Sequence, residues 1–258
     1  MIEFECKRKI SLGRVEGPTQ DKKHMSKTVQ TKTKTAKVRV AANGGYQKGE
    51  ETRERILNAA LKEFGEASFL AATTRHIAEA ASVSLPTLQY YFGSKEGMYL
   101  ACAEAIVAQY RSNTTAAAEA TEALRMGCEA ETARAHLKAV IGALAGFLVG
   151  SRKAARWTHF VARELRDPGP AFEILYANLW RPGVEITARL IARILGKLEN
   201  DPAARIQALL LISSLLVFQS GRSMSLRVMQ WTTIGHKELA MVLSCLNAQI
   251  DAIGRVSS

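Results

Sequence analysis

The sequence has few of the residues that cross-link small proteins or bind metal ions. Its 258 residues include four cysteines and five histidines, and none of these stand at the close spacings of zinc sites or disulfide frameworks. We therefore expect free thiols, a reducing cytoplasmic location, and neither a metal site nor another cofactor. The cysteines are Cys6, Cys102, Cys128 and Cys245.

Patterns typical of catalysis are also missing. The sequence contains no Ser/His/Asp arrangement, no glycine-rich phosphate loop, and no helix that carries paired carboxylates with a histidine at metal-binding spacing. We therefore expect a binding protein and not an enzyme.

The chain lacks the apolar runs that would place it in a membrane. Its longest run, residues 208–218, is shorter than the roughly 20 residues that span a bilayer, and Ser213 and Ser214 interrupt it. The amino-terminal region has no apolar centre of the kind that a secretory signal needs. Because 47% of the residues are apolar, we expect a soluble globular protein with one large core or two modest ones.

Positive charge is concentrated at the amino terminus. Residues 1–48 contain twelve Lys/Arg and four Asp/Glu, so twelve minus four gives +8 of the net +11 of the chain. This tail has few aromatic residues and cannot bury enough apolar surface to offset its ordering entropy, so we expect disorder. Two interpretations stay open: a basic arm that adds salt-sensitive affinity for phosphates, or residues added by an upstream start, with Met25 as the natural beginning.

Beyond residue 48, apolar residues recur at helical spacing and no alternating strand pattern is found, which predicts an all-α fold. The segment 114–131 is weakly periodic and is expected to be a loop with at most one short helix. Pro182 is expected to kink the helix that contains it, after Arg181. The predicted helices are 50–66, 73–82, 85–92, 95–113, 132–149, 152–166, 171–195, 203–219 and 236–253. We expect a small three-helix domain at 49–97 and a larger helical bundle at 98–258.

Two short helices of the small domain form a predicted helix-turn-helix motif at residues 73–92. They are joined by a three-residue turn, and an inward set of side chains holds them at a steep angle. The second helix, 85–92, then presents its outer face for the major groove of DNA. The inward residues are Ile77, Ala81, Val83, Leu88 and Phe92.

The outer face of the second helix carries side chains suited to base edges. Gln89 has the donor and acceptor pair that matches adenine, and Leu85, Pro86 and Thr87 suit thymine methyl groups. Tyr90 can reach a base or the backbone. Further contacts are expected where the helices begin, because free backbone amides and polar side chains there bind phosphate. The residues expected to make them are Thr73, Arg75, Ser84, Tyr91 and Lys95.

The run from Thr52 to Leu100 resembles the DNA-binding domain of TetR/AcrR regulators, above all in RHIAEAASVSLPTLQYYFGSKE at 75–96. The resemblance implies that Tyr91 and Lys95 bind phosphates and that the helix around 87–90 reads bases. The family usually has glycine where this chain has Ser68 and Ser82, and an acidic residue at His76. We expect a strained turn and not a lost one.

The segment RELRDPGPAFEILY at 163–176, followed by Trp180-Arg-Pro, resembles the ligand domain of CecR-type members of this family. The resemblance implies a homodimer formed through the last two long helices, 203–219 and 236–253, and an effector pocket inside each bundle. Independently, residues 208–218 are apolar nearly all round, which favours burial on several sides, as at a dimer interface.

Aromatic and polar residues of the large bundle are the candidates for the effector pocket, because such pockets combine apolar walls with a few polar groups. More than half of them are expected to belong to the core. They are Trp157, Phe160, Arg163, Tyr176, Trp180, Phe218, Gln219 and Arg222.

The sequence thus predicts a ligand-responsive repressor that binds a palindromic operator as a homodimer and is released by an unknown small-molecule effector. The alternative is a non-specific nucleic-acid-binding protein that relies on its basic tail.

Overall fold

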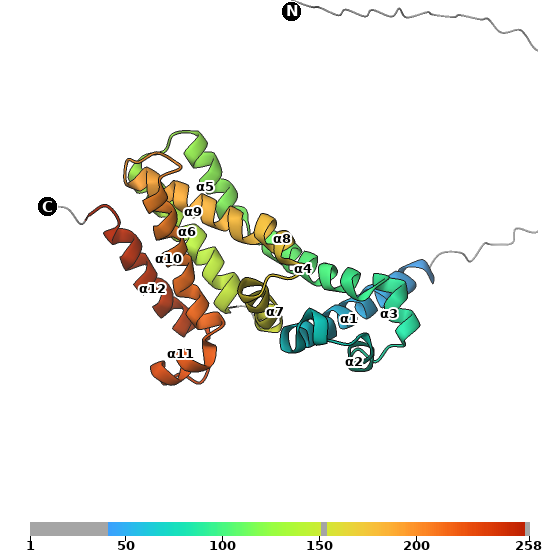
Figure 1. The fold of residues 1–258 in the computed structure, drawn as a ribbon. Helices are drawn as coiled ribbons and strands as arrows, with labels where there is room; N and C mark the ends of the chain where they lie inside the picture. The colour runs from blue at the N-terminus through green and yellow to red at the C-terminus, as the bar shows by residue number, and fades with distance from the viewer. Residues whose placement is uncertain (1–40, 151–153, 256–258) are drawn as a thin grey trace, which may run out of the picture. The chain divides into compact units, whose positions relative to one another are not determined.

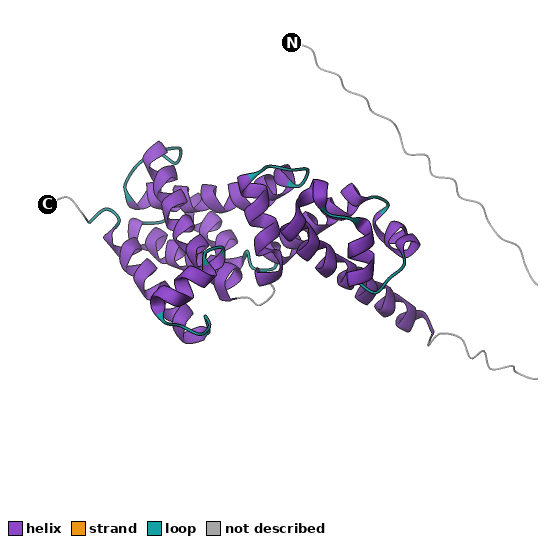
Figure 2. Cartoon of the chain, turned by 60° about the horizontal axis from the view of Figure 1, so that its bottom comes forward, coloured by secondary structure: helices purple, strands orange, loops and turns teal. Residues whose placement is uncertain are grey.

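The computed structural model describes residues 41–150 and 154–255. These residues form helices and connecting turns, with no strand in the described ranges (Figures 1 and 2). The predicted all-α fold class is confirmed. Most of the predicted tail, residues 1–40, lies outside the described part.

The amino-terminal domain contains a long first helix, the two helices of the predicted motif, and a connecting helix. The first helix starts nine residues before the predicted residue 50, so part of the predicted tail is helical. Gly44 and Gly45 do not prevent this, because extending an existing helix costs far less than starting one. These helices are α1 (Ala41–Ala71), α2 (Thr74–Ala80), α3 (Leu85–Phe92) and α4 (Lys95–Arg111).

The two serines that stand where glycine was expected both have positive φ angles. Ser68 has φ 71° and ψ 166° and interrupts α1, whereas Ser82, in the turn after α2, has φ 53°. A side chain at such angles is strained. The expectation of strained turns is therefore confirmed. The predicted end of the first helix at residue 66 is wrong, because helical geometry resumes after Ser68 and α1 runs to Ala71.

The carboxy-terminal bundle contains one helix that the sequence allowed only as a short element and one that it did not predict. The first, α5, occupies most of the predicted loop 114–131, and the second is α11. α5 buries Ala120 and Leu124 and packs against α6 and α9. Tertiary contacts therefore decide its conformation. The bundle elements are α5 (Thr115–Arg125), α6 (Ala130–Ala145), η1 (Gly146–Gly150), α7 (Ala154–Arg166), α8 (Phe172–Leu175), η2 (Tyr176–Trp180), α9 (Arg181–Ile194), α10 (Pro202–Gln219), α11 (Arg222–Met229) and α12 (His236–Ala252).

The helix predicted at 171–195 is interrupted just before its proline. A π-helical turn, η2, separates α8 from α9, and the N–H of Arg181 bonds to the carbonyl of Tyr176, five residues back. Pro182 has no N–H to continue the α-helical ladder, and a π-turn accommodates such a gap. The interruption is therefore present, but it lies before Arg181 and not after it.

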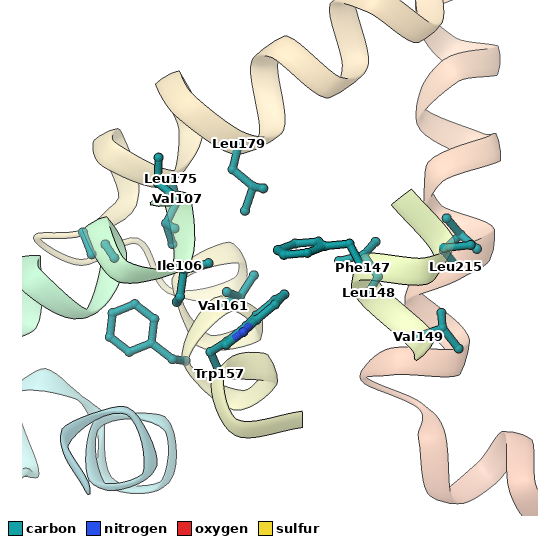
Figure 3. Close-up of a cluster of buried hydrophobic side chains, with 14 of the residues drawn as sticks. Ile106, Val107, Phe147, Leu148, Val149, Trp157, Val161, Leu175, Leu179 and Leu215 are labelled. Atoms are coloured by element: carbon teal, nitrogen blue, oxygen red, sulfur yellow. The ribbon is translucent and has the colours of Figure 1, made fainter. Parts of the chain in front are cut away.

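Apolar side chains from α4, η1, α7 and η2 meet in one layer of the bundle core (Figure 3). The rings of Phe147 in η1 and Trp157 in α7 face one another with centroids 4.9 Å apart, and Ile106 and Val107 of α4 are buried in the same cluster. Leu179 of η2 is buried too. This layer connects α4 to the rest of the bundle.

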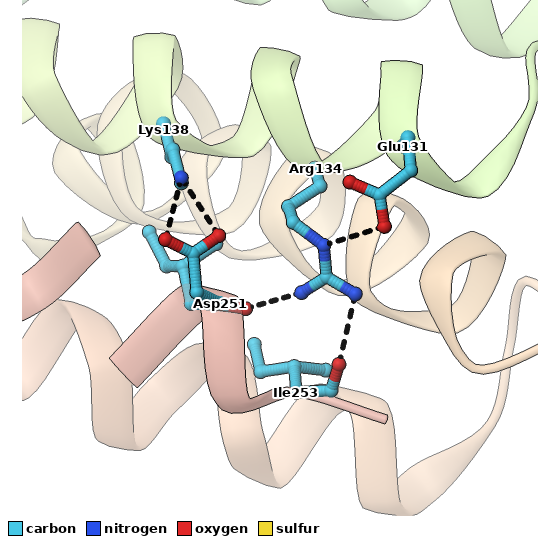
Figure 4. Close-up of polar contacts among 6 residues, drawn as sticks. Glu131, Arg134, Lys138, Asp251 and Ile253 are labelled. Carbon is cyan, nitrogen blue, oxygen red and sulfur yellow. Dashed lines mark hydrogen bonds and ion pairs between the residues drawn. The ribbon is translucent and has the colours of Figure 1, made fainter. Parts of the chain in front are cut away.

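Polar contacts fix the last helix against α6 (Figure 4). Arg134 is 6% exposed and donates to the carbonyl oxygens of Ile250 and Ile253 at the end of α12, and also to Glu131. Lys138 pairs with Asp251 at 2.7 Å, and this contact lowers the pKa of the Asp251 carboxyl. A buried guanidinium thus satisfies carbonyls that a helix end leaves free.

Candidate nucleic-acid interface

The helix-turn-helix forms as the sequence predicts, with a side-chain cap at the start of each helix. The hydroxyl of Thr73 accepts from the N–H of His76 at 3.2 Å, and the hydroxyl of Ser84 accepts from the N–H of Thr87 at 3.2 Å. Such caps satisfy amides that a helix start leaves free. Leu88 is 1% exposed and anchors α3, so the opposite face of α3 must point outward.

That outer face of α3 carries most of the predicted base-reading side chains. Leu85, Pro86, Gln89 and Tyr90 are exposed, and Tyr90 reaches 84%. Thr87 is half-buried, and its hydroxyl lies 2.8 Å from that of Ser84. The face therefore offers one amide, one phenol and several apolar groups to a partner.

The predicted phosphate contacts lie around this face. Thr73 and Arg75 are exposed at the start of α2, with Arg75 3.6 Å from Glu79. Tyr91 is half-buried beside Tyr90, with ring centroids 5.3 Å apart. A Cβ on Gly49 of α1 would lie 3.6 Å from the Tyr91 hydroxyl. The Tyr91 hydroxyl therefore lies close to the α1 backbone at Gly49.

His76 of the motif and Lys95, directly after it, make contacts that the sequence did not predict. Lys95 donates to the carbonyl of Leu70 at 3.2 Å, and its Nζ lies 5.1 Å from the ring centroid of Phe69. An ammonium group has three donors, so Lys95 can hold the end of α1 and still contact a phosphate. His76 lies 3.4 Å from Glu63 of α1, which ties α2 to α1. No sequence pattern identifies the carbonyl of Leu70 as the partner of Lys95, or Glu63 as the partner of His76.

Comparisons with known proteins identify the motif. Residues 56–102 match the family of bacterial regulatory proteins described as the tetR family. Residues 133–255 match the C-terminal domain of the HTH-type transcriptional dual regulator CecR. The chain belongs to the TetR family of transcriptional regulators. It is therefore a DNA-binding transcriptional regulator, and such regulators are typically not enzymes.

Individual relatives match this TetR-family regulator over different shares of its length. It is 29% identical over 213 residues to the HTH-type transcriptional dual regulator CecR of Shigella flexneri, covering 80% of this chain and 92% of the relative. It is 40% identical over 68 residues to the HTH-type transcriptional regulatory protein RaaS of Mycobacterium tuberculosis, covering 26% of this chain and 32% of the relative. A TetR-like transcriptional regulator from Rhodococcus sp. has a similar fold, with TM-score 0.56, 18% identity, and coverage of 80% of this chain and 97% of that chain.

In this TetR-family regulator, three of the predicted effector residues lie on α7. Trp157 is buried against Phe147. Phe160 is fully buried, with its ring centroid 4.7 Å from that of Tyr99. Arg163 is half-buried and donates to two carbonyl oxygens of α1. Phe160 and Arg163 thus contribute to packing between helices.

Three other candidates lie in aromatic pairs elsewhere in the bundle. Tyr176 stacks on Phe172 and is 42% exposed, and Trp180 contacts the same ring at 5.4 Å. Phe218, at the end of α10, stacks on Trp231 at 6.4 Å. These pairs lie on different elements from Trp157.

The last two candidates flank the turn between α10 and α11. Gln219 is 7% exposed, and its Nε2 has no hydrogen-bond partner among the residues that the structure describes. Arg222 is half-buried. The eight candidates therefore occupy three regions, and the geometry does not gather them around one cavity. They stay predictions.

Two small cavities are lined in part by residues of the core layer. A cavity of about 20 Å³ is lined by Tyr110, Phe147 and Gly183, among others. Another of about 120 Å³ is lined by Trp157 and by residues of α1 and α4. Drug-sized ligands occupy about 300–1,000 Å³, so each cavity is too small as it stands. Phe147 lines the first cavity and Trp157 lines the second, and the two rings are in contact.

The α10 helix has an exposed apolar face. Ile206, Leu209, Leu210 and Val217 are 58%, 51%, 65% and 37% exposed. An open groove of about 630 Å³ is lined by α10 and by the end of α12. The helical segments 130–150 and 202–219 are long and apolar enough to cross a membrane by length and composition alone. Core helices of soluble proteins often have the same length and composition, so these two segments are weak evidence for a membrane protein. Contiguous exposed apolar surface of this kind is typical of an interaction site.

Proposed function

We propose that this regulator is a repressor that binds palindromic operator DNA as a homodimer and is released from it by a small-molecule effector. The observation that carries the proposal is the outer face of α3. Leu88 anchors the helix from inside, while Gln89 and Tyr90 are exposed beside capped helix starts. A helix presented in this way fits the major groove.

The side chains of the motif divide between base reading and phosphate binding. Gln89 would bond to an adenine edge, and Leu85, Pro86 and the Thr87 methyl group would contact thymine methyl groups. Tyr90 would reach a base or the backbone. Phosphates would be held by Thr73, Arg75, Tyr91 and Lys95, with Ser84 at the amino end of α3.

A second copy of the chain is the proposed partner of the α10 face. The four apolar side chains from Ile206 to Val217 lie along three turns of one helix, and Met241 of α12 is 47% exposed. Two-fold pairing of α10 and α12 with the same helices of a second chain would remove this surface from water. It would also present two α3 helices to one duplex, which matches a palindromic site.

The effector is proposed to open the two small cavities beside Phe147 and Trp157. Both rings are largely buried, so a mostly apolar molecule would replace their contacts at low cost. α4 carries Tyr110 at one cavity and follows directly after the DNA-binding motif. An effector that favours a form with wrongly spaced α3 helices would shift the population away from DNA. We place this regulator in the cytoplasm, where it would meet DNA.

Selection of preferred DNA sequences by the wild type and by Gln89→Ala tests the proposal. We expect a two-fold symmetric site for the wild type. In the variant, preference at one base pair of each half-site should fall by about 1–3 kcal/mol, because the amide that reads the base edge is lost. Glu119→Ala, at an exposed glutamate of α5, is the control and should select the wild-type site. If the wild type selects no symmetric site, the proposal is wrong.

The alternative function, non-specific binding through the basic tail, is tested by a chain that starts at Ala41. Residues 1–40 contain eleven Lys/Arg and four Asp/Glu, a net charge of eleven minus four, or +7. We expect the shortened chain to keep its site preference and to bind with a weaker salt dependence, because each lost phosphate contact lowers the log–log slope by about 0.9. Fluorescence anisotropy at several salt concentrations measures both.

A chain that starts at Met25 is the matched control for this deletion. Residues 25–40 contain five Lys/Arg and no acid, so this chain keeps five of the seven net positive charges. Its salt dependence should stay close to that of the full chain. Equal loss of binding to all sequences on removal of residues 1–40 would instead favour the non-specific alternative.

A further inference from the structure

A cluster of buried polar contacts joins α1, α4 and α7, and we call it the α1–α4–α7 junction. Its side chains are Tyr99 of α4 and Arg163 and Glu164 of α7. Tyr99 and Glu164 are each 1% exposed. The Tyr99 hydroxyl donates to Oε1 of Glu164 at 2.5 Å, and the N–H of Gly169 donates to Oε2 at 3.2 Å. Both carboxylate oxygens are therefore engaged.

Arg163 binds a different partner from its neighbour Glu164. Its Nε and Nη2 donate to the carbonyl oxygen of Gly65 at 3.2 and 3.1 Å, and Nη2 also donates to that of Glu66 at 2.9 Å. These carbonyls precede the break in α1 at Ser68. A guanidinium is well suited to carbonyls at a helix end. Consecutive residues of α7 thus hold α1 and α4 separately.

Two glycines show how closely the junction is packed. A Cβ on Gly65 would lie 2.9 Å from Cβ of His159 and 3.1 Å from the backbone nitrogen of Phe160. A Cβ on Gly169 would lie 2.6 Å from Oε1 of Glu164. There is no room for α1 to slide across α7 while these contacts persist.

The contacts of the junction favour one arrangement of α1, α4 and α7, because other arrangements would break its buried hydrogen bonds. A buried carboxylate that loses its hydrogen-bond donors is strongly destabilised. Burial raises the pKa of the Tyr99 phenol, so it remains a donor at neutral pH. The rings of Phe64, Phe69 and Phe160 surround Tyr99, with centroids 4.7, 4.9 and 4.7 Å away. The second turn of α4, directly after the DNA-binding motif, is therefore fixed to α7.

We propose that Tyr99, Arg163 and Glu164 are positioning residues that set the half-site spacing accepted by the dimer. The inference rests on the proposed function as a homodimer on a palindromic site. One added base pair moves a half-site by about 3.4 Å and rotates it by about 35°. A DNA-binding domain held at two points of α7 cannot follow such a change, whereas a loosened one can.

Binding to operators of altered spacing tests this inference. The half-sites are those that the wild type selects, with one or two base pairs inserted or removed between them. We expect the wild type to prefer one spacing by about tenfold or more, which corresponds to about 1.4 kcal/mol. Tyr99→Phe, Glu164→Gln and Arg163→Met should reduce this preference at least about threefold, a loss of about 0.65 kcal/mol or more. Base preference inside each half-site should not change, because α3 is unaltered.

Matched controls separate positioning from general destabilisation. Glu104→Gln replaces an exposed carboxylate on the same helix as Tyr99, and Arg189→Met removes a surface arginine that bonds to Glu199 through two nitrogens. Both should keep the wild-type spacing preference. Arg163→Lys keeps the charge but not the two-nitrogen contact and should be intermediate, which provides a conservative variant if Arg163→Met does not fold.

Two outcomes would contradict the inference at different levels. A symmetric site whose spacing preference survives in all the folded junction variants would overturn this inference alone. Absence of any symmetric site for the wild type would overturn the proposed function, and this inference with it. Thermal unfolding of each variant, followed by circular dichroism, identifies those that are folded.

Discussion

Replacing Leu210 with glutamate is expected to convert the protein into a monomer and to lower its affinity for a palindromic operator by about 10²–10⁴. Leu210 is 65% exposed at the centre of the apolar face of α10. In a two-fold interface each substitution occurs twice, so two carboxylates would be buried in an apolar contact. Two linked half-sites bind far more tightly than one, and the monomer loses that gain.

Sedimentation velocity and operator binding measure this effect. The matched control is Met126→Glu, at a side chain that is 71% exposed in the turn after α5. α5 packs against α6 and α9 and not on the α10 face, so this variant should stay dimeric and bind as the wild type does. A Leu210→Glu chain that remains dimeric with unchanged affinity would place the interface elsewhere.

Replacing Ser68 with glycine is expected to stabilise the protein, although glycine usually destabilises a helix. Ser68 has φ 71° and ψ 166°, a region that is nearly restricted to glycine and costs other residues about 1–3 kcal/mol. Glycine loses more conformational entropy on folding, by about 0.5–1 kcal/mol. The relief of strain is the larger effect. The free energy of unfolding should therefore rise, and Tm with it, by about 2–4 °C for each kcal/mol.

Ala67→Gly is the matched control for this substitution, because it lies one residue earlier in the same helix at helical angles. It should destabilise the protein by about 0.5–1 kcal/mol. Ser82→Gly, where φ is 53°, should stabilise as well, but by less, because that left-handed region is accessible to other residues. If Ser68→Gly behaves like Ala67→Gly in denaturant unfolding, the backbone at Ser68 is not strained.

The DNA-binding motif was readable from the sequence because its determinants are local. Caps at Thr73 and Ser84 define the helix starts, and Leu88 fixes by its spacing which face of α3 is buried. The exposure of Gln89 and Tyr90 follows from that spacing. None of these inferences needs to know what lies against α2 and α3 from elsewhere in the chain.

The contacts of Lys95 and Arg163 were not readable from the sequence. Each side chain donates to backbone carbonyls of α1, and every residue has such a carbonyl, so no residue type indicates the partner. Lys95 was predicted only as a phosphate ligand. Arg163 was predicted as an effector ligand, whereas the structure shows it binding the end of α1.

The sequence by itself determined the all-α class, the helix-turn-helix and the outer face of α3, because periodicity, caps and turn residues act within a few positions of each other. Only the tertiary structure decided that 115–125 is a helix, that α1 and α7 approach at Gly65, and that the Ile206–Val217 face is exposed. These features depend on packing between segments far apart in the chain. The free energy of such contacts overrides weak local preferences and leaves no local pattern.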